Sequence, residues 1–224
     1  MPAEQKSETD VVFFDLDGTL TDPKVGITRS IQSALEHFDV PIPSADDLTW
    51  CIGPPLHASF LSILGSESRA ARAVELYRER YSDVGLFENV PYEGVVEMLA
   101  EIVGSQRRLF VATSKPWPFA DRIIERFGLR DYFGRVFGAE LDGTRSDKGE
   151  LLRYALKETS VDPTTAVMIG DRKHDIIGAA KNGMAAVGVL YGYGSREELS
   201  EAGATRLCKS PKDIADLITQ REAA

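Results

Sequence analysis

The segment VVFFDLDGTL, residues 11–20, places two carboxylates and a glycine directly after four apolar residues. A short apolar run bounded by a turn signal is typical of a strand that is covered on both faces, as in parallel sheets. Functional groups in such sheets lie at the carboxyl ends of the strands. We therefore expect Asp15 and Asp17 to face one crevice, where Gly18 lets the backbone turn sharply under a ligand. The competing interpretation is an ordinary surface Asp-Gly turn.

Composition limits the kinds of protein that the chain can be. Its 224 residues, 43% of them hydrophobic, predict one domain or one domain with a small insertion. The formal net charge of -9 argues against a nucleic-acid polymer or a membrane surface as partner, because nothing supplies a broad positive field.

The two cysteines predict neither a disulfide framework nor a thiol phosphatase. A cysteine phosphatase needs Cys-x5-Arg, but the sixth residue after Cys51 is His57 and the sixth after Cys208 is Ile214. Residues 1–10 form a polar tail without an apolar signal region, and no apolar run is long enough to span a membrane. These features predict a soluble, cytoplasmic protein.

Helical patterns follow the first strand. Helices are expected over residues 23–37 and 68–81 and from Pro54-Pro55 onward, and Ser44 is expected to cap a further short helix. No strand signal is visible between Leu20 and Phe87. The sequence therefore predicts a helical block inserted after the first strand of an α/β protein.

Strands and helices alternate from Tyr92 onward, as in doubly wound sheets. The expected strands are 109–113, 136–139, 166–170 and 185–190, and the expected helices are 93–103, 118–127, 148–158, 175–181 and 212–218. Gly192-Tyr193-Gly194 does not complete a dinucleotide fingerprint, because Glu197 stands where the third glycine would be.

Three further stations of the chain carry polar residues at predicted strand ends or helix starts. Thr113 and Ser114 end one strand, Lys148 begins a helix, and Asp171 and Asp175 follow another strand. Each alone has an ordinary explanation as a helix cap or a solvated surface residue. The carboxyl ends of strands in a doubly wound sheet converge, so these stations are expected to meet Asp15.

The four stations together resemble the four signatures of the haloacid dehalogenase-like (HAD) hydrolases, in the family's order. The resemblance implies an α/β fold with a Rossmann-like core and a central parallel sheet, formed by residues 1–20 and 89–224. It also implies a small all-helical cap domain at residues 21–88.

The chemistry that this resemblance implies is phosphoester hydrolysis. Asp15 would form an aspartyl-phosphate, and Asp17 would act as general acid and base. Dehalogenases of the superfamily lack this second Asp, so Asp17 favours phosphoryl transfer. The implied metal ligands are Asp15, the carbonyl of Asp17, Asp171 and Asp175. Such oxygen-only ligation suits Mg²⁺, and the three scattered histidines do not resemble a zinc site.

The remaining implied roles concern the phosphoryl group. Thr113 and the Ser114 amide would hold its oxygens, Thr19 would orient Asp17, and Asp175 would fix metal waters or Lys148. Lys148 is the expected phosphate-stabilising cation by its position in the chain, and Lys115 and Arg145 are the competing candidates.

The cap is where specificity for a small phosphorylated metabolite is expected. The candidates to face the crevice are Gly53, in the turn Ile52–Leu56, and Arg29, Arg78 and Tyr81. The competing interpretation is that the two arginines are exposed helix residues. The Gly-Pro-Pro-Leu turn resembles that of phosphoglycolate phosphatases and 5′-nucleotidase-like phosphatases.

Two alternatives stay open. One is a β-phosphoglucomutase-like phosphomutase, in which the last signature usually reads Glu-Asp where this chain has Gly170-Asp171. The other is a catalytically silent HAD-fold binding protein. The sequence does not decide the physiological substrate or the oligomeric state.

Overall fold

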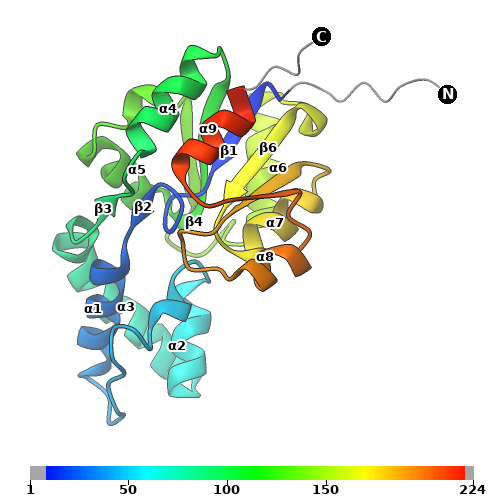
Figure 1. Ribbon diagram of the computed structural model, residues 1–224. Helices are drawn as coiled ribbons and strands as arrows, with labels where there is room; N and C mark the ends of the chain where they lie inside the picture. The colour runs from blue at the N-terminus through cyan, green and yellow to red at the C-terminus, as the bar shows by residue number, and fades with distance from the viewer. Residues whose placement is uncertain (1–8, 220–224) are drawn as a thin grey trace.

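The computed structural model describes residues 9–219, which fold around a six-stranded parallel sheet (Figure 1). The order of the strands across the sheet is β5-β4-β1-β6-β7-β8. Their bounds are β1 Val11–Phe14, β4 Arg108–Pro116, β5 Arg135–Ala139, β6 Ala166–Gly170, β7 Ala185–Val189 and β8 Arg206–Cys208. The predicted polar tail at residues 1–10 lies outside the described residues except for its last two.

Strand β1 lies in the centre of the sheet and is covered on both faces. Its four residues have no exposed surface, and they alternate between two hydrophobic clusters. Val12 and Phe14 belong to one cluster, and Val11 and Phe13 belong to the other, as the period of two in a strand requires. The prediction of a doubly covered parallel strand is confirmed.

Helices form a layer on each face of this sheet. One cluster contains residues of α4 (Val95–Gly104), α5 (Trp117–Arg126) and α9 (Pro211–Thr219). The other contains residues of α6 (Lys148–Thr159), α7 (Lys173–Ala180) and α8 (Arg196–Glu201). The predicted α/β class with a central parallel sheet is confirmed. The predicted core elements agree with these bounds to within two residues, except that β4 continues three residues past its predicted end at Thr113.

Two elements of the core were not expected from the sequence. Strand β8 has three residues at the edge of the sheet, and the six-residue α8 has the polar sequence Arg-Glu-Glu-Leu-Ser-Glu. Neither is long enough to show a hydrophobic period, and tertiary contacts with the sheet make each of them regular.

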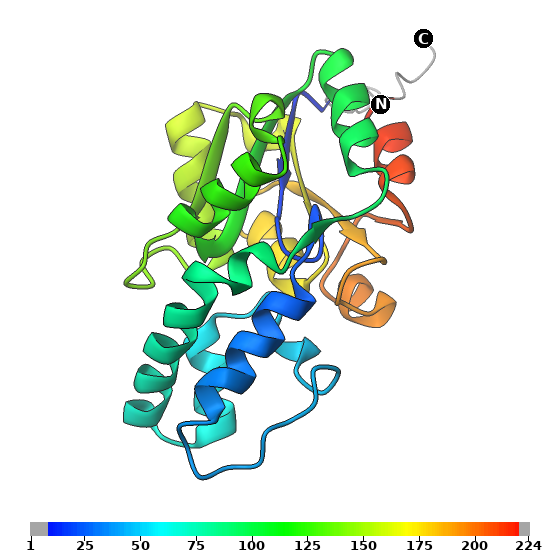
Figure 2. The ribbon, with the colours of Figure 1, turned by 90° about the vertical axis from the view of Figure 1, so that its left-hand side faces the viewer.

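Three helices pack together beside the carboxyl ends of the sheet strands (Figure 2). They are α1 (Lys24–Leu35), α2 (Leu56–Leu64) and α3 (Glu67–Asp83), which we call the cap helices. The short helix expected after Ser44 is wrong: the Ser44 hydroxyl accepts the Asp47 N–H in a turn that leads into a single 3₁₀ turn at Thr49–Cys51. Further 3₁₀ turns lie at Gly85–Phe87, Arg130–Tyr132 and Pro163–Thr165.

The two chain segments that connect the core to the cap helices pair as a small antiparallel ribbon. Its strands are β2 (Thr21–Asp22) and β3 (Val90–Pro91), so the expectation of no strand between Leu20 and Phe87 is wrong at Thr21–Asp22. Two-residue strands carry no periodic signal. The predicted domain boundaries at residues 21 and 88 remain a prediction.

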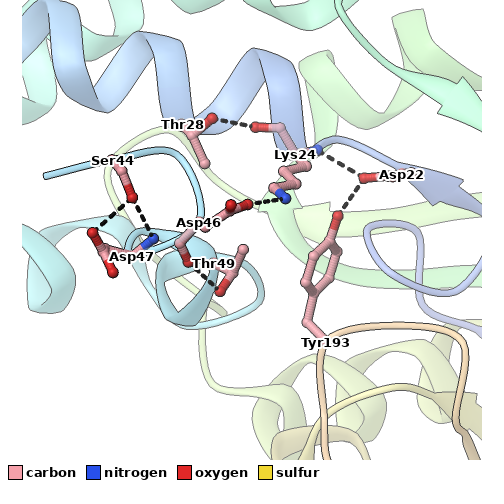
Figure 3. A network of polar contacts seen from close by, with 8 residues as sticks. All are labelled: Asp22, Lys24, Thr28, Ser44, Asp46, Asp47, Thr49 and Tyr193. Atoms are coloured by element: carbon pink, nitrogen blue, oxygen red, sulfur yellow. Dashed lines mark hydrogen bonds and ion pairs between the residues drawn. The ribbon is translucent and has the colours of Figure 1, made fainter.

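Polar contacts tie this ribbon to both parts of the protein (Figure 3). The carboxylate of Asp22 accepts hydrogen bonds from the backbone N–H of Lys24 and from the hydroxyl of Tyr193 in the core. Lys24 Nζ lies 2.5 Å from Asp46 Oδ1 in the loop between α1 and α2. The start of the cap is thereby connected to a core loop.

The described part of the chain contains no helix that is both long and apolar enough to cross a membrane. Cys51 and Cys208 are buried and free.

Replacement of Phe13 by Ala tests the central position of β1. Phe13 is fully buried and stacks on Phe110 with ring centroids 5.3 Å apart. We expect the unfolding free energy to fall by about 3–5 kcal/mol, the usual cost of a large cavity, as measured by urea denaturation. Val96→Ala, at a position that is 43% exposed on α4, is the control and should change it by less than about 0.5 kcal/mol. Equal losses in the two variants would contradict the central role of β1.

Candidate active site

The strand order brings the predicted stations together. Strand β1 lies between β4 and β6. Asp15 and Asp171 directly follow β1 and β6, and Thr113 lies in β4 just before its pairing with β5 shifts. Lys148 and Asp175 belong to the first turns of α6 and α7, on one face of the sheet. Residues far apart in the chain therefore meet at one edge of the sheet.

Three carboxylates form the centre of this site. Asp15, Asp171 and Asp175 are buried, and each offers an oxygen within 4.8 Å of the others. Burial, with Asp175 and Asp15 nearby, raises the pKa of Asp171 well above its usual range, and burial raises the pKa of Asp175 to about 6. In the described part of the chain, Asp171 Oδ1 is buried without a hydrogen-bond partner. A set of oxygen donors with an unsatisfied atom fits a hard divalent cation.

Lys148 contacts two of these carboxylates. Its Nζ lies 3.1 Å from Asp15 Oδ1 and 2.8 Å from Asp175 Oδ1, and it donates a hydrogen bond to the Ala112 carbonyl at 2.8 Å. Burial alone lowers the pKa of Lys148, but Asp15 and Asp175 outweigh it and raise the pKa above its usual value. The buried ammonium is therefore kept charged next to Asp15.

The two competing cations lie in different places. Lys115 Nζ is 2.6 Å from Asp17 Oδ2, so this lysine also belongs to the site. Arg145 pairs with Glu140 and its guanidinium lies over the ring of Tyr154, 4.4 Å from the centroid. Of the three candidates, Lys148 is the one that contacts Asp15.

Asp17 is buried beside Asp15. Burial raises the pKa of Asp17 above its usual range, although the Lys115 ammonium opposes this shift. A carboxyl with a raised pKa holds a proton more readily near neutral pH, as a general acid must.

Two glycines allow the carboxylates to approach the backbone. Gly18 has φ +82°, and a Cβ there would lie 2.2 Å from Asp171 Oδ2. A Cβ on Gly170 would lie 2.2 Å from Asp175 Oδ2. Any side chain at these positions would push a carboxylate out of the site, so both glycines are required by the packing.

The predicted phosphate-binding hydroxyls differ in their surroundings. Thr113 is buried, faces the cavity described below, and accepts the Lys115 N–H at 3.2 Å. The Ser114 hydroxyl donates to the Ser146 carbonyl, which leaves the Ser114 N–H as its candidate ligand group. The Thr19 hydroxyl is buried and has no hydrogen-bond partner in residues 9–219, so it does not hold Asp17 through a hydrogen bond.

A cavity of about 460 Å³ lies between the carboxylates and the cap helices. Asp15 and Asp17 line it from the core, and Gly53, Arg78 and Tyr81 line it from the cap. Arg78 also donates to the Leu141 carbonyl across the cavity at 2.7 Å.

Arg29 is a predicted substrate-binding residue that lies elsewhere. It is not among the residues that line the cavity. Its side chain is 60% exposed and pairs with Glu88 at 2.8 Å. The structure therefore places Arg29 on the surface of the cap, in the position that the competing interpretation described.

Two residues of the site were not predicted. Arg172, which follows Asp171, donates to the Ile52 carbonyl at 2.5 Å and to Glu198 at 3.0 Å, so it joins the core to the turn that contains Gly53. The Tyr193 N–H donates to Asp171 Oδ2 at 2.8 Å. The position of Arg172 within the fourth signature could have indicated that it belongs to the site. Nothing in the local sequence Gly192-Tyr193-Gly194 indicates a carboxylate partner.

Comparison with known proteins agrees with this geometry. A family model described as haloacid dehalogenase-like hydrolase matches residues 12–189. A 5′-nucleotidase of Pseudomonas aeruginosa is 45% identical over 94% of this chain and 93% of its own length. The tyrosine-protein kinase PtkA of Mycobacterium tuberculosis is 40% identical over 87% of this chain and 67% of its own length.

A solved structure is similar over nearly the whole chain. The crystal structure of a "predicted phosphatase" from Clostridium acetobutylicum has a TM-score of 0.92 and 40% identity, over 95% of this chain and 99% of that one. The fold, the site and these relatives agree, and the chain belongs to the haloacid dehalogenase-like hydrolase family, in which it is a phosphatase.

Proposed function

We propose that the protein is a Mg²⁺-dependent phosphomonoesterase that acts through an aspartyl-phosphate on Asp15. The observation that carries this proposal is the pair of carboxylates at the floor of the cavity. Asp15 lies against the Lys148 ammonium at 3.1 Å, and Asp17 lies beside it with an oxygen that has no partner in the described residues. A nucleophile next to a general acid is the minimum that ester cleavage requires.

In the first step an oxygen of Asp15 bonds to phosphorus and the ester P–O bond breaks. Asp17 gives its proton to the leaving oxygen, so the alcohol departs neutral. In the second step Asp17, now a carboxylate, takes a proton from water while the water oxygen bonds to phosphorus. The bond between Asp15 and phosphorus breaks, and both carboxyls return to their starting states.

Other groups of the chain hold the phosphoryl oxygens during both steps. The Thr113 hydroxyl and the Ser114 N–H supply neutral donors, and Lys148 supplies a positive charge. Lys148 lies at the first turn of α6 and is 4% exposed, so its charge is little screened by water. Asp175 holds Lys148 in place through a contact of 2.8 Å.

Mg²⁺ fits the cluster formed by the carboxylates of Asp15, Asp171 and Asp175, together with the Asp17 carbonyl. Four buried carboxylates, including that of Asp17, face two buried lysines, so two negative charges are left over when all are ionised. When bound, the cation supplies neutralisation of these carboxylates and of the phosphoryl oxygens. The unpartnered Asp171 Oδ1 supports this assignment.

We propose a nucleoside 5′-monophosphate as the substrate class, in keeping with the name of the Pseudomonas relative. The wall of the cavity carries apolar and aromatic side chains, among them Leu56, Val74 and Tyr77 from the cap helices and Phe119 from α5 of the core. An apolar wall suits the planar base of a nucleoside. It suits the carboxylate of 2-phosphoglycolate less well, because Lys115 faces Asp17, His57 pairs with Glu67 at 3.3 Å, and Arg78 already donates to the Leu141 carbonyl at 2.7 Å.

The packing around Gly170 argues against the phosphomutase alternative. A glutamate at this position, as in the mutase signature, would place its Cβ inside the Asp175 carboxylate. The complete set of Asp15, Asp17, Lys148 and Asp171 likewise argues against a silent binding protein. We propose that residues 21–88 act as the cap domain that contacts the leaving group.

Phosphate release from a panel of esters tests the function. With Mg²⁺ present, we expect kcat/KM for nucleoside 5′-monophosphates to exceed that for 2-phosphoglycolate and hexose phosphates by at least about tenfold, a difference of about 1.4 kcal/mol in transition-state binding. Excess chelator should abolish release from every ester. Isomerisation of hexose phosphates without phosphate release would contradict the proposal that the protein is a hydrolase.

Substitutions of the two carboxylates test the mechanism. Asp15→Asn should abolish turnover because no carboxylate oxygen is left to bond to phosphorus. Asp17→Asn should reduce the rate at least about 10²-fold, the low end for loss of general acid catalysis. Phosphate release is the measurement, and the folded state is checked by circular dichroism. Turnover that survives in Asp15→Asn would exclude the covalent mechanism.

Thermal unfolding tests the metal ligands without relying on activity. Mg²⁺ at about 100 times its Kd should stabilise the wild type by about 2.7 kcal/mol through mass action. Asp171→Asn should lose this stabilisation because it removes a buried charged ligand. Asp131→Asn, at an exposed position away from the site, should retain it. An equal Mg²⁺ effect in both variants would contradict the assignment of Asp171.

A further inference from the structure

Lys115 has a place in the site that the phosphatase chemistry derived above does not use. It lies on β4 at the point where the pairing with β5 shifts between Thr113 and Pro116. Its side chain is only 6% exposed, and its Nζ lies 2.6 Å from Asp17 Oδ2. The same Nζ donates a hydrogen bond to the Tyr81 hydroxyl at 2.5 Å and lies 4.7 Å from the centroid of the Tyr81 ring. A buried ammonium with these contacts has a defined position.

The two oxygens of Asp17 are distinguished by this contact. Oδ2 faces Lys115, whereas Oδ1 is buried and has no hydrogen-bond partner within residues 9–219. An ammonium group has three donors and no acceptor, so it stabilises negative charge on the oxygen that it faces. The contact therefore holds the Asp17 carboxyl in one orientation, with Oδ2 toward Lys115.

We propose that Lys115 is a positioning residue that holds the Asp17 carboxyl in the orientation from which it gives its proton to the leaving oxygen of the substrate. This inference rests on the proposed role of Asp17 as the general acid. It separates the tasks of the two buried lysines, because Lys148 faces Asp15 and Asp175 and Lys115 faces Asp17.

Tyr81 extends this arrangement to the cap. It belongs to α3, is 1% exposed, and stacks on Tyr77 with centroids 5.0 Å apart. Its ring also meets the edge of Phe119 on α5 at 5.7 Å. Because this packing restrains the phenol, Tyr81 holds Lys115 where it can reach Asp17. The acid of the core is thus oriented by a residue of the cap helices.

The choice of leaving group tests this role. A nucleoside 5′-monophosphate releases an alkoxide that needs a proton, whereas p-nitrophenyl phosphate releases a stable phenolate that does not. We expect Lys115→Met to reduce kcat/KM for the nucleotide by about 10- to 100-fold, part of the usual contribution of general acid catalysis. For p-nitrophenyl phosphate the reduction should be less than about threefold. The ratio kcat/KM covers the steps up to formation of the phosphoenzyme.

Three further variants sharpen the comparison. Lys115→Arg keeps a positive donor and should lose less nucleotide activity than Lys115→Met. Tyr81→Phe should show the same dependence on the leaving group to a smaller extent. Lys157→Met, at an exposed position on α6, should leave both substrates unchanged.

Equal losses on both substrates in Lys115→Met would overturn the proposal, because they would assign Lys115 to phosphate binding or to structure. A wild type that releases phosphate from neither ester would instead refute the proposed function.

A test without catalysis uses the urea midpoint. Tyr81→Phe should lower it in the wild type and have no further effect in Lys115→Met, because the contact is then already lost. Additive shifts would overturn the proposed link between Tyr81 and Lys115.

Discussion

The structure depends on the balance of buried charge at the carboxyl end of β1. Asp15, Asp17, Asp171 and Asp175 are all at most 8% exposed, and the ammonium groups of Lys148 and Lys115 contact Asp15, Asp175 and Asp17. Burying like charges together is costly unless partners or a cation compensate them. The raised pKa values of Asp17, Asp171 and Asp175 express this cost. A protein retains such a cluster where its chemistry needs it.

The remaining architecture makes this concentration of charge possible. A parallel sheet brings the carboxyl ends of β4, β1 and β6 side by side, so groups remote in sequence meet without long loops. Gly18 and Gly170 remove the side chains that would occupy the space of Asp171 and Asp175. The two hydrophobic clusters on either face of β1 hold the strand that carries Asp15 and Asp17.

Contacts between the core and the cap helices converge on the same loops. Arg172, the residue after Asp171, donates a hydrogen bond to the Ile52 carbonyl. The Tyr193 hydroxyl donates to Asp22, and the backbone N–H of the same tyrosine donates to Asp171. Lys115 and Tyr81 add a third connection beside Asp17. The position of the cap helices is therefore tied to the loops that carry the carboxylates, which supports the proposal that the cap contacts the leaving group.

The sequence by itself determined the fold class, the central strand and the order of the four stations. Long apolar runs and helical periods are local signals, and the spacing of Asp15, Asp17, Asp171 and Asp175 is visible without coordinates. It did not reveal β2, β3 or β8, because strands of two or three residues are too short to show a period. It did not reveal α8, because the six residues of this helix are mostly polar.

Only the tertiary structure decided which cation faces which carboxylate and which cap residues reach the cavity. Lys115, Arg145 and Lys148 look alike in sequence, yet they face Asp17, Glu140 and Asp15 in turn. Arg29 and Arg78 are both cap arginines, but only Arg78 lines the cavity. The physical reason is that a side chain's partner depends on how helices and strands pack, and hydrogen-bonded residues here are separated by up to 172 positions in the chain.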